Sequence, residues 1–169
     1  MKALVLIAEG FEDLELFCPW FRLREEGVEV TVASPGGKPV SGRHGYRIES
    51  DMPIREANPS EYDLLLLPGG SAPELLRLRE EAVDVARTFA DEGLRIAALG
   101  HAPQLLLSAG ALGGRTLTCA AGIRDDVRAA GATYRDEAVV VDGNLLTGRG
   151  SDDLPEFNAQ LVLFLSVQA

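Results

Sequence analysis

The sequence predicts an α/β fold in which a doubly wound, mostly parallel sheet carries helices on both faces. Short runs of consecutive apolar residues, such as 96–99, suit strands that are buried on both faces of a parallel sheet. Longer amphipathic segments come between these runs, and glycine or proline marks most of the boundaries. Because strands alternate with helices along the chain, we expect crossover connections and parallel pairing.

The first part of the chain predicts two strands, one helix and a hairpin. A buried strand at 3–8 precedes a helix at 14–26, whose large apolar side chains recur on one side. Gly27 ends that helix, and a second strand follows at 28–33. Turn residues are frequent over 35–50, so this segment is expected to form an antiparallel hairpin.

The next elements are a third buried strand at 62–67 and a long amphipathic helix at 72–92. The dipeptide Gly69-Gly70 follows Pro68 between them. It is either a simple tight turn or a pair of bare backbone amides suited to an anion or a carbonyl oxygen.

The stretch 95–110 is the part around which we expect the rest of the fold to be organised. A strand at 96–99 leads into a helix that starts near Gln104 and ends at Gly110, a plausible C′ glycine. The sharp turn between them lies at the carboxyl edge of the sheet, where open α/β sheets bind ligands. Hydrolases use such an elbow to present Ser or Cys. Here the apex is Gly100, which has no side chain and for which we expect unusual, positive-φ dihedrals.

The last part of the chain predicts a strand at 115–119, a helix at 122–130 and a tight hairpin. The hairpin joins strands at 138–141 and 144–147 through Asp142-Gly143, which favours a type I′ turn. Ser151 is expected to cap a final helix, with two aspartates in its first turn.

Length and composition indicate one soluble domain spanning residues 1–169. Hydrophobic residues make up 46% and charged residues 25%, as in ordinary globular proteins. The net charge of −10 argues against a nucleic-acid partner. Two cysteines imply no disulfide framework, and the first apolar run is too short for a signal peptide or a membrane span. We therefore expect a cytoplasmic protein that does not associate with membranes.

Several short motifs, in this order, make the chain resemble the ThiJ/PfpI superfamily over essentially all 169 residues. The resemblance is to its PfpI-like intracellular protease and glyoxalase/deglycase branch. It implies a flavodoxin-like, class I glutamine amidotransferase-like sandwich with β-hairpins. The segments that carry it are 10–16, 42–46, 67–74, 101–104, 122–126 and 140–144.

The resemblance also implies the residues of a catalytic site. The family elbow reads Cys-His-Gly-Pro-Gln, with the Cys as nucleophile, the His as its partner and a first-helix Glu beside the thiol. This chain keeps Glu12, His101 and Glu74 as the implied catalytic residues, the last approaching from an adjacent subunit. It has Gly100 at the nucleophile position, where no covalent thiol chemistry can start. Ala120 stands where the branch has an aromatic residue.

Each candidate residue also has a simpler interpretation. Glu12 is either a pocket carboxylate or a solvated acid at a helix start, and Glu74 is either an intersubunit group or a helix-start acid. His101 either acts on water or substrate, or only packs the elbow. Cys119 ends a strand near the elbow and is either buried packing or a relocated nucleophile.

The two remaining candidates are simpler still. His44 is expected on the hairpin surface, and Cys18 is expected to be a small buried hydrophobe. Two histidines without a cysteine or acid at ligand spacing predict no zinc site. No cofactor is expected.

Three functions follow from this reading. The first is a stress-associated pseudoenzyme that binds a small carbonyl or carboxylate among Gly70, Gly100, His101 and Glu12. The second is a working enzyme, a hydrolase or a glyoxalase/deglycase, which uses Glu12 and His101 as acid and base or uses Cys119. The third is an assembly protein. In each case we expect a homo-oligomer, either a dimer or a hexamer.

Overall fold

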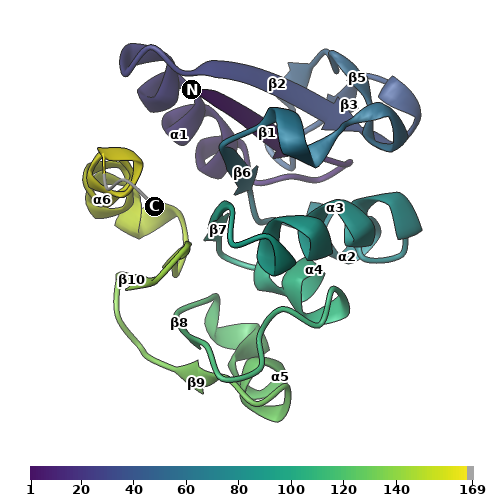
Figure 1. Cartoon of the computed structure of the whole chain (residues 1–169). Coiled ribbons are helices and arrows are strands. Elements are labelled where there is room, and N and C mark those ends of the chain that lie inside the picture. The colour runs from purple at the N-terminus through teal and green to yellow at the C-terminus, as the bar shows by residue number, and fades with distance from the viewer. Residues whose placement is uncertain (167–169) are drawn as a thin grey trace.

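The structure, a computed structural model, describes residues 1–166 and has a twisted central sheet between two layers of helices (Figure 1). The sheet order is β10-β11-β7-β6-β1-β2-β5, and every neighbouring pair is parallel except β10 and β11. The predicted doubly wound α/β fold is therefore confirmed. From edge to edge the strands are Val139–Asp142, Leu145–Gly148, Arg95–Leu99, Leu64–Leu67, Lys2–Leu6, Glu29–Ser34 and Met52–Pro53.

The helices form two groups on opposite sides of the sheet (Figure 1). One group contains α1 (Asp13–Glu25) and α6 (Leu154–Ser166), which pack against each other. In the other, α4 (Pro103–Ser108) packs against α2 (Ala72–Leu76) and α3 (Glu80–Asp91). No helix in residues 1–166 is long and apolar enough to cross a membrane.

The core lies in the central strands because both of their faces are covered. β6 consists of four leucines, none of them more than 1% exposed. Burial of a leucine side chain contributes roughly 1.5–3 kcal/mol, which explains why such continuous apolar runs mark the central strands. The strand ends, where the chain leaves this core, hold the polar groups described below.

The long helix predicted over 72–92 is wrong, because the chain breaks into α2 and α3. Arg79 takes an extended conformation and precedes α3. Leu78 is 76% exposed, so the apolar pattern that suggested one continuous helix does not face one core. The Arg77 Nε donates a hydrogen bond to Ser108 Oγ of α4 (2.9 Å), which holds the end of α2 against its neighbour.

The final hairpin is present, but its turn lies one residue later than predicted. Asp142 pairs with Leu145, so the two-residue loop is Gly143-Asn144. Only Gly143 has positive φ (+58°), which fits a type II′ turn and not the expected type I′ turn. The Asn144 side chain donates to the Leu94 carbonyl oxygen (2.7 Å), an interaction that holds the turn in this register.

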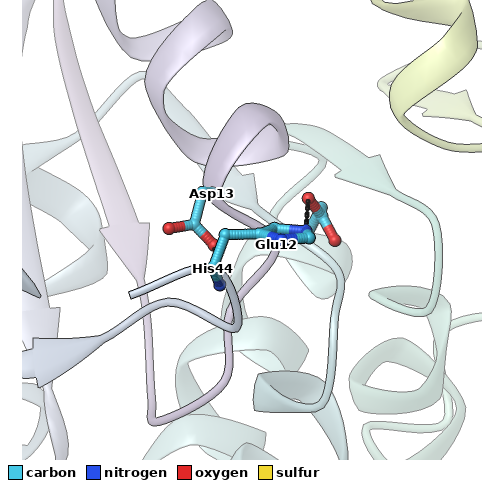
Figure 2. A group of neighbouring side chains, drawn as sticks. All are labelled: Glu12, Asp13 and His44. Atoms are coloured by element: carbon cyan, nitrogen blue, oxygen red, sulfur yellow. Dashed lines mark hydrogen bonds and ion pairs between the residues drawn. The ribbon is translucent and has the colours of Figure 1, made fainter. Parts of the chain in front are cut away.

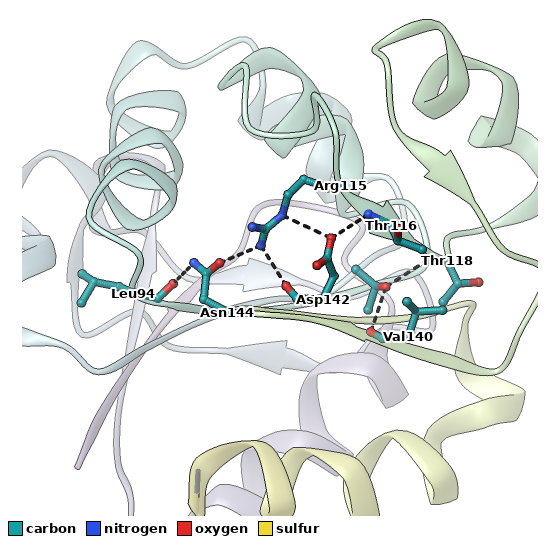
Figure 3. A network of polar contacts seen from close by, with 8 residues as sticks. Leu94, Arg115, Thr116, Thr118, Val140, Asp142 and Asn144 are labelled. Carbon is teal, nitrogen blue, oxygen red and sulfur yellow. Dashed lines mark hydrogen bonds and ion pairs between the residues drawn. The ribbon is translucent and has the colours of Figure 1, made fainter. Parts of the chain in front are cut away.

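The predicted strand 115–119 shrinks to β8 (Thr116–Leu117), which pairs with β9 (Thr133–Tyr134) outside the main sheet. Side chains of the main sheet accept hydrogen bonds from the backbone of this part of the chain (Figure 3). The Asp142 carboxylate accepts from the Thr116 amide (2.7 Å), and buried Thr147 Oγ1 accepts from the Thr118 amide (3.0 Å). Helix α5 (Arg124–Ala129) follows a short 3-10 turn and takes most of the predicted helix 122–130.

The predicted hairpin within 35–50 is confirmed as β3 (Val40–Ser41) and β4 (Arg47–Ile48). The remaining 3-10 segments are Pro35–Gly37, Ile54–Glu56, Pro59–Glu61 and Ser151–Asp153. The last of them precedes α6, and Ser151 does not cap that helix as predicted. Its hydroxyl is instead directed to the Glu15 carboxylate (3.3 Å), on a different element.

Candidate functional site

The elbow between β7 and α4 has the geometry that the sequence predicts. Gly100 has φ +57°, a conformation that glycine adopts without a steric cost. Its amide donates to the Gly148 carbonyl oxygen (3.0 Å), and its own carbonyl oxygen accepts from the Ala120 amide (2.9 Å). The apex is therefore held from both sides by backbone hydrogen bonds.

Glu15 is the side chain that lies against this apex. A Cβ atom placed on Gly100 would meet the two Glu15 carboxylate oxygens at 2.9 and 3.0 Å. The carboxylate accepts a hydrogen bond from the Gly69 amide at the end of β6 (2.8 Å), and the Ser151 hydroxyl donates to its other oxygen. The apex has no side chain of its own, and the carboxyl group that lies against it comes from α1.

The environment of Glu15 favours its neutral form. The residue is 4% exposed, and this burial raises the pKa of its carboxyl group from 4.5 to about 7. The Gly69 hydrogen bond opposes the shift, and the nearby Glu12 charge adds to it. Near neutral pH the group is therefore able to give or to take a proton.

Sequence reasoning missed Glu15, although a signal for it exists. Glu15, Pro19 and Leu23 are spaced by four residues, so they lie on one face of α1, and all three are buried. A carboxylate in the same helical row as two core residues indicates burial. The large apolar side chains that we used to orient the helix lie mostly on neighbouring positions.

Glu12, the residue that the resemblance pointed to, lies at the rim of the site and not against Gly100. Its carboxylate is 3.2 Å from His44 Nε2 (Figure 2) and 3.4 Å from an Arg43 guanidinium nitrogen, both on the β3–β4 hairpin. Its amide donates to the Gly69 carbonyl oxygen (3.1 Å). Glu12 therefore links the hairpin to the end of β6.

The same rim brings an acid to His44 that the sequence spacing did not reveal. Possible ligand atoms of Glu12, Asp13 and His44 lie within 4.8 Å of one another (Figure 2). The Asp13 oxygens, however, accept hydrogen bonds from the amides of His44 (2.9 Å) and Tyr46 (3.1 Å). With the Arg43 guanidinium also beside Glu12, the geometry favours a hydrogen-bonded anchor for the hairpin over a cation site.

Two backbone amides at the site are available to a ligand. The neighbouring amides of Gly69 and Gly100 are occupied by Glu15 and Gly148. Within residues 1–166 no acceptor bonds the amides of Gly70 and His101. Gly70 adopts φ +77°, a conformation that glycine reaches without a steric cost. Paired amides of this kind suit an oxygen that carries negative charge.

Comparison with known proteins places the chain in a family. The protein-family model described as "DJ-1/PfpI family" matches residues 1–163 of the sequence. The chain belongs to the DJ-1/PfpI family. Among curated relatives, the deglycase PfpI of Pyrococcus furiosus is 47% identical over 165 residues, covering 98% of this chain and 99% of the relative. Protein/nucleic acid deglycase 2 of Escherichia coli is 42% identical over 167 residues, covering 97% of each.

Solved structures of the DJ-1/PfpI family agree with the fold. A two-domain protein of Anabaena variabilis with DJ-1/ThiJ/PfpI-like and ferritin-like domains superposes with a TM-score of 0.94 at 35% identity. The match covers 97% of this chain and 48% of that one. DJ-1beta of Drosophila melanogaster gives a TM-score of 0.89 at 30% identity, covering 99% of this chain and 91% of that one.

His101, which the resemblance implies as a catalytic residue, is half-buried beside the elbow. Burial lowers the pKa of its imidazole, the Arg43 charge lowers it further and Glu74 opposes the shift. A Cβ on Gly122 would lie 3.6 Å from His101 Nε2, so the ring packs near this small residue. At neutral pH the imidazole is uncharged, which suits it to accept a hydrogen bond. Glu74 is exposed in the first turn of α2.

The surroundings of Cys119 disfavour a relocated nucleophile. Cys119 is fully buried, and burial together with Asp126 raises the pKa of its thiol to about 12. A reactive cysteine needs the opposite shift, because the thiolate is the nucleophile. The adjacent Ala120 amide bonds Gly100, so Cys119 does lie near the elbow as expected. Cys18 is half-buried on α1.

Proposed function

We propose that this DJ-1/PfpI protein binds a small carbonyl or carboxylate compound at the elbow and has little or no thiol-dependent activity. The observation that carries the proposal is the position of Glu15 against a side-chain-free apex, next to the amides of Gly70 and His101, which no acceptor in the described part of the chain bonds. A ligand oxygen accepts from these amides, while Gly100 leaves no nucleophile to attack it.

Family relatives named deglycases support a ligand of the kind that the ThiJ/PfpI resemblance implies, a small carbonyl compound. The resemblance implies a cysteine nucleophile at the position where this chain has Gly100. Loss of a covalent nucleophile costs several orders of magnitude in rate, although an oxyanion site retains some residual rate. We therefore propose a stress-associated pseudoenzyme.

A second candidate is acid–base catalysis on a small carbonyl compound without a thiol. The observation in its favour is the raised pKa of Glu15, about 7, in combination with the neutral His101 imidazole. Glu15 serves better here than Glu12, whose carboxylate is already paired with Arg43 and His44. The buried Cys119 gives little support to a relocated nucleophile.

The test compares the wild type with Gly100→Cys, Cys119→Ala and Glu15→Gln on methylglyoxal and on small amide substrates. We expect a slow wild type, partial gain of activity in Gly100→Cys and no effect of Cys119→Ala. A fast wild type that Cys119→Ala inactivates would refute the pseudoenzyme. A fast wild type that only Glu15→Gln inactivates would favour the second candidate.

We also propose a cytoplasmic homo-oligomer, a dimer or a hexamer, in which Glu74 completes the site of an adjacent subunit. Its exposure at the start of α2 leaves its carboxylate accessible to a neighbouring subunit, which supports this role. Light scattering at micromolar concentration should report at least a dimer. A monomer would remove Glu74 from the intersubunit role and leave the elbow site unchanged.

A further inference from the structure

We propose that the elbow binds small monocarboxylates together with one proton, which the ligand shares with the Glu15 carboxyl group. This inference rests on the proposed function and selects one of its two ligand classes. It also assigns Glu15 a specific task, which is to supply the proton that makes an anionic ligand acceptable at this place.

The first step is that the two available amides lie on chain segments that contact Glu15. The Gly70 amide follows the Gly69 amide, which bonds a Glu15 oxygen at 2.8 Å. The His101 amide follows Gly100, whose Cβ position is 2.9 Å from that same oxygen. The carboxyl group of Glu15 therefore lies between the two chain segments that carry the donors.

The second step is that two ionised carboxylates cannot share this position. Glu15 is 4% exposed, so water screens the repulsion between such charges poorly. When two carboxylates share a buried site, one of them takes up a proton. The protonated Glu15 then donates its O–H to the ligand, and the two amides donate to the ligand carboxylate.

The third step is that no other described group within residues 1–166 removes the need for the proton at Glu15. The elements around it contribute the Gly69 amide and the Ser151 hydroxyl, which are uncharged donors. The charges that act on it are Glu12, which makes ionisation less favourable, and Arg43, which has the weakest effect of all. Arg43 is 55% exposed and already paired with Glu12.

The two other titratable groups of the site do not change this balance. His101 is uncharged at neutral pH because burial lowers its pKa, and Glu74 acts on that ring from the surface. Above the Glu15 pKa of about 7, binding of a carboxylate must therefore take a proton from the solvent. An uncharged carbonyl compound has no such requirement.

The experiment is an NMR titration of the full chain that follows the amide signals of Gly70 and His101. The probes are sodium acetate, which stays ionised throughout, and acetamide as its uncharged counterpart. Between about pH 5.5 and about pH 7 we expect a nearly constant Kd for acetate. Above about pH 7 it should rise about tenfold per pH unit, whereas that of acetamide should not change.

Two variants assign the proton to Glu15. Glu15→Gln keeps an acceptor for the Gly69 amide and a donor for the ligand, so it should bind acetate with no pH dependence. Glu25→Gln changes an exposed carboxylate at the other end of the same helix and should behave as the wild type. Calorimetry of the wild type in two buffers of different ionisation enthalpy provides a readout that does not depend on either variant folding. It should count about one proton taken up per acetate at about pH 8.5.

The outcomes separate this inference from the function on which it rests. Acetate binding with no proton uptake, or with a pH dependence that Glu15→Gln keeps, would overturn the inference and leave the proposed binding function in place. Binding of acetamide alone would do the same and would identify carbonyl compounds as the ligands. If neither probe moves the Gly70 and His101 signals at any pH, both proposals fail.

Discussion

Burial of Glu15 should make this protein less stable as the pH rises, and Glu15→Gln should remove that effect. The folded-state pKa of about 7 lies above the ordinary value of 4.5, so the folded protein binds more protons than the unfolded chain between these values. Stability is therefore highest below pH 4.5 as far as this group is concerned, and it is lost as the pH rises through 7. The whole shift corresponds to about 3 kcal/mol, of which about 2 kcal/mol falls between about pH 5.5 and about pH 8.5.

The assay is urea unfolding of the wild type and Glu15→Gln at both pH values. The comparison between the two proteins isolates Glu15, because all other titrating groups are shared. From the lower to the higher pH, the free energy of unfolding of the variant should rise by about 2 kcal/mol relative to that of the wild type. The reason is that glutamine accepts the Gly69 hydrogen bond without a buried charge. Glu25→Gln, an exposed change on the same helix, should show no such gain. A difference between Glu15→Gln and the wild type that is the same at both pH values would refute the reasoning.

Three further changes test other parts of the structure. Gly100→Cys should lower the free energy of unfolding by roughly 1–3 kcal/mol in chemical denaturation, because a side chain at φ +57° is strained and its Cβ meets the Glu15 oxygens. An unchanged denaturation midpoint would contradict the elbow geometry. Thr147→Val should cost about 1–3 kcal/mol in the same assay, since it leaves the buried Thr118 amide without an acceptor, whereas Thr147→Ser should cost less. Cys119 should react with Ellman's reagent only after unfolding, as expected for a buried thiol with a pKa of about 12, and fast labelling of Cys119 in the native protein would show that it is accessible.

The sequence was sufficient for the central sheet, because four-leucine β6 and its neighbours can only be stable when both faces are covered. It was insufficient where tertiary contacts outweigh local pattern. The break at Leu78–Arg79 interrupts a helical pattern that is continuous in the sequence. The register of the last hairpin depends on the bond from Asn144 to Leu94, which are distant in the sequence. Both features become visible only when the elements have packed.

The elbow was predictable from the sequence, whereas the carboxylate facing it was not. A strand, a glycine and a helix in succession specify the turn and its positive φ. Glu12 directly precedes α1 and Glu15 lies in its first turn, and the resemblance alone did not distinguish them. Which one faces Gly100 depends on how α1 is rotated about its axis when it packs against α6 and β2. The spacing from Glu15 to Pro19 was the available clue.

The anchor between Asp13 and the β3–β4 hairpin makes the rim of the site adaptable. The Asp13 carboxylate accepts hydrogen bonds from the main-chain amides of His44 and Tyr46. A Cβ on Gly42 would collide with this carboxylate. Because main-chain amides belong to every residue except proline, the contacts made by Asp13 do not depend on which side chains the loop carries. The side chains of Arg43 and His44 pair with Glu12, so changing them alters the rim of the site while the Asp13 anchor remains. A library randomised at these two positions, with Asp13 and Gly42 retained, would sample new ligand preferences without rebuilding the fold.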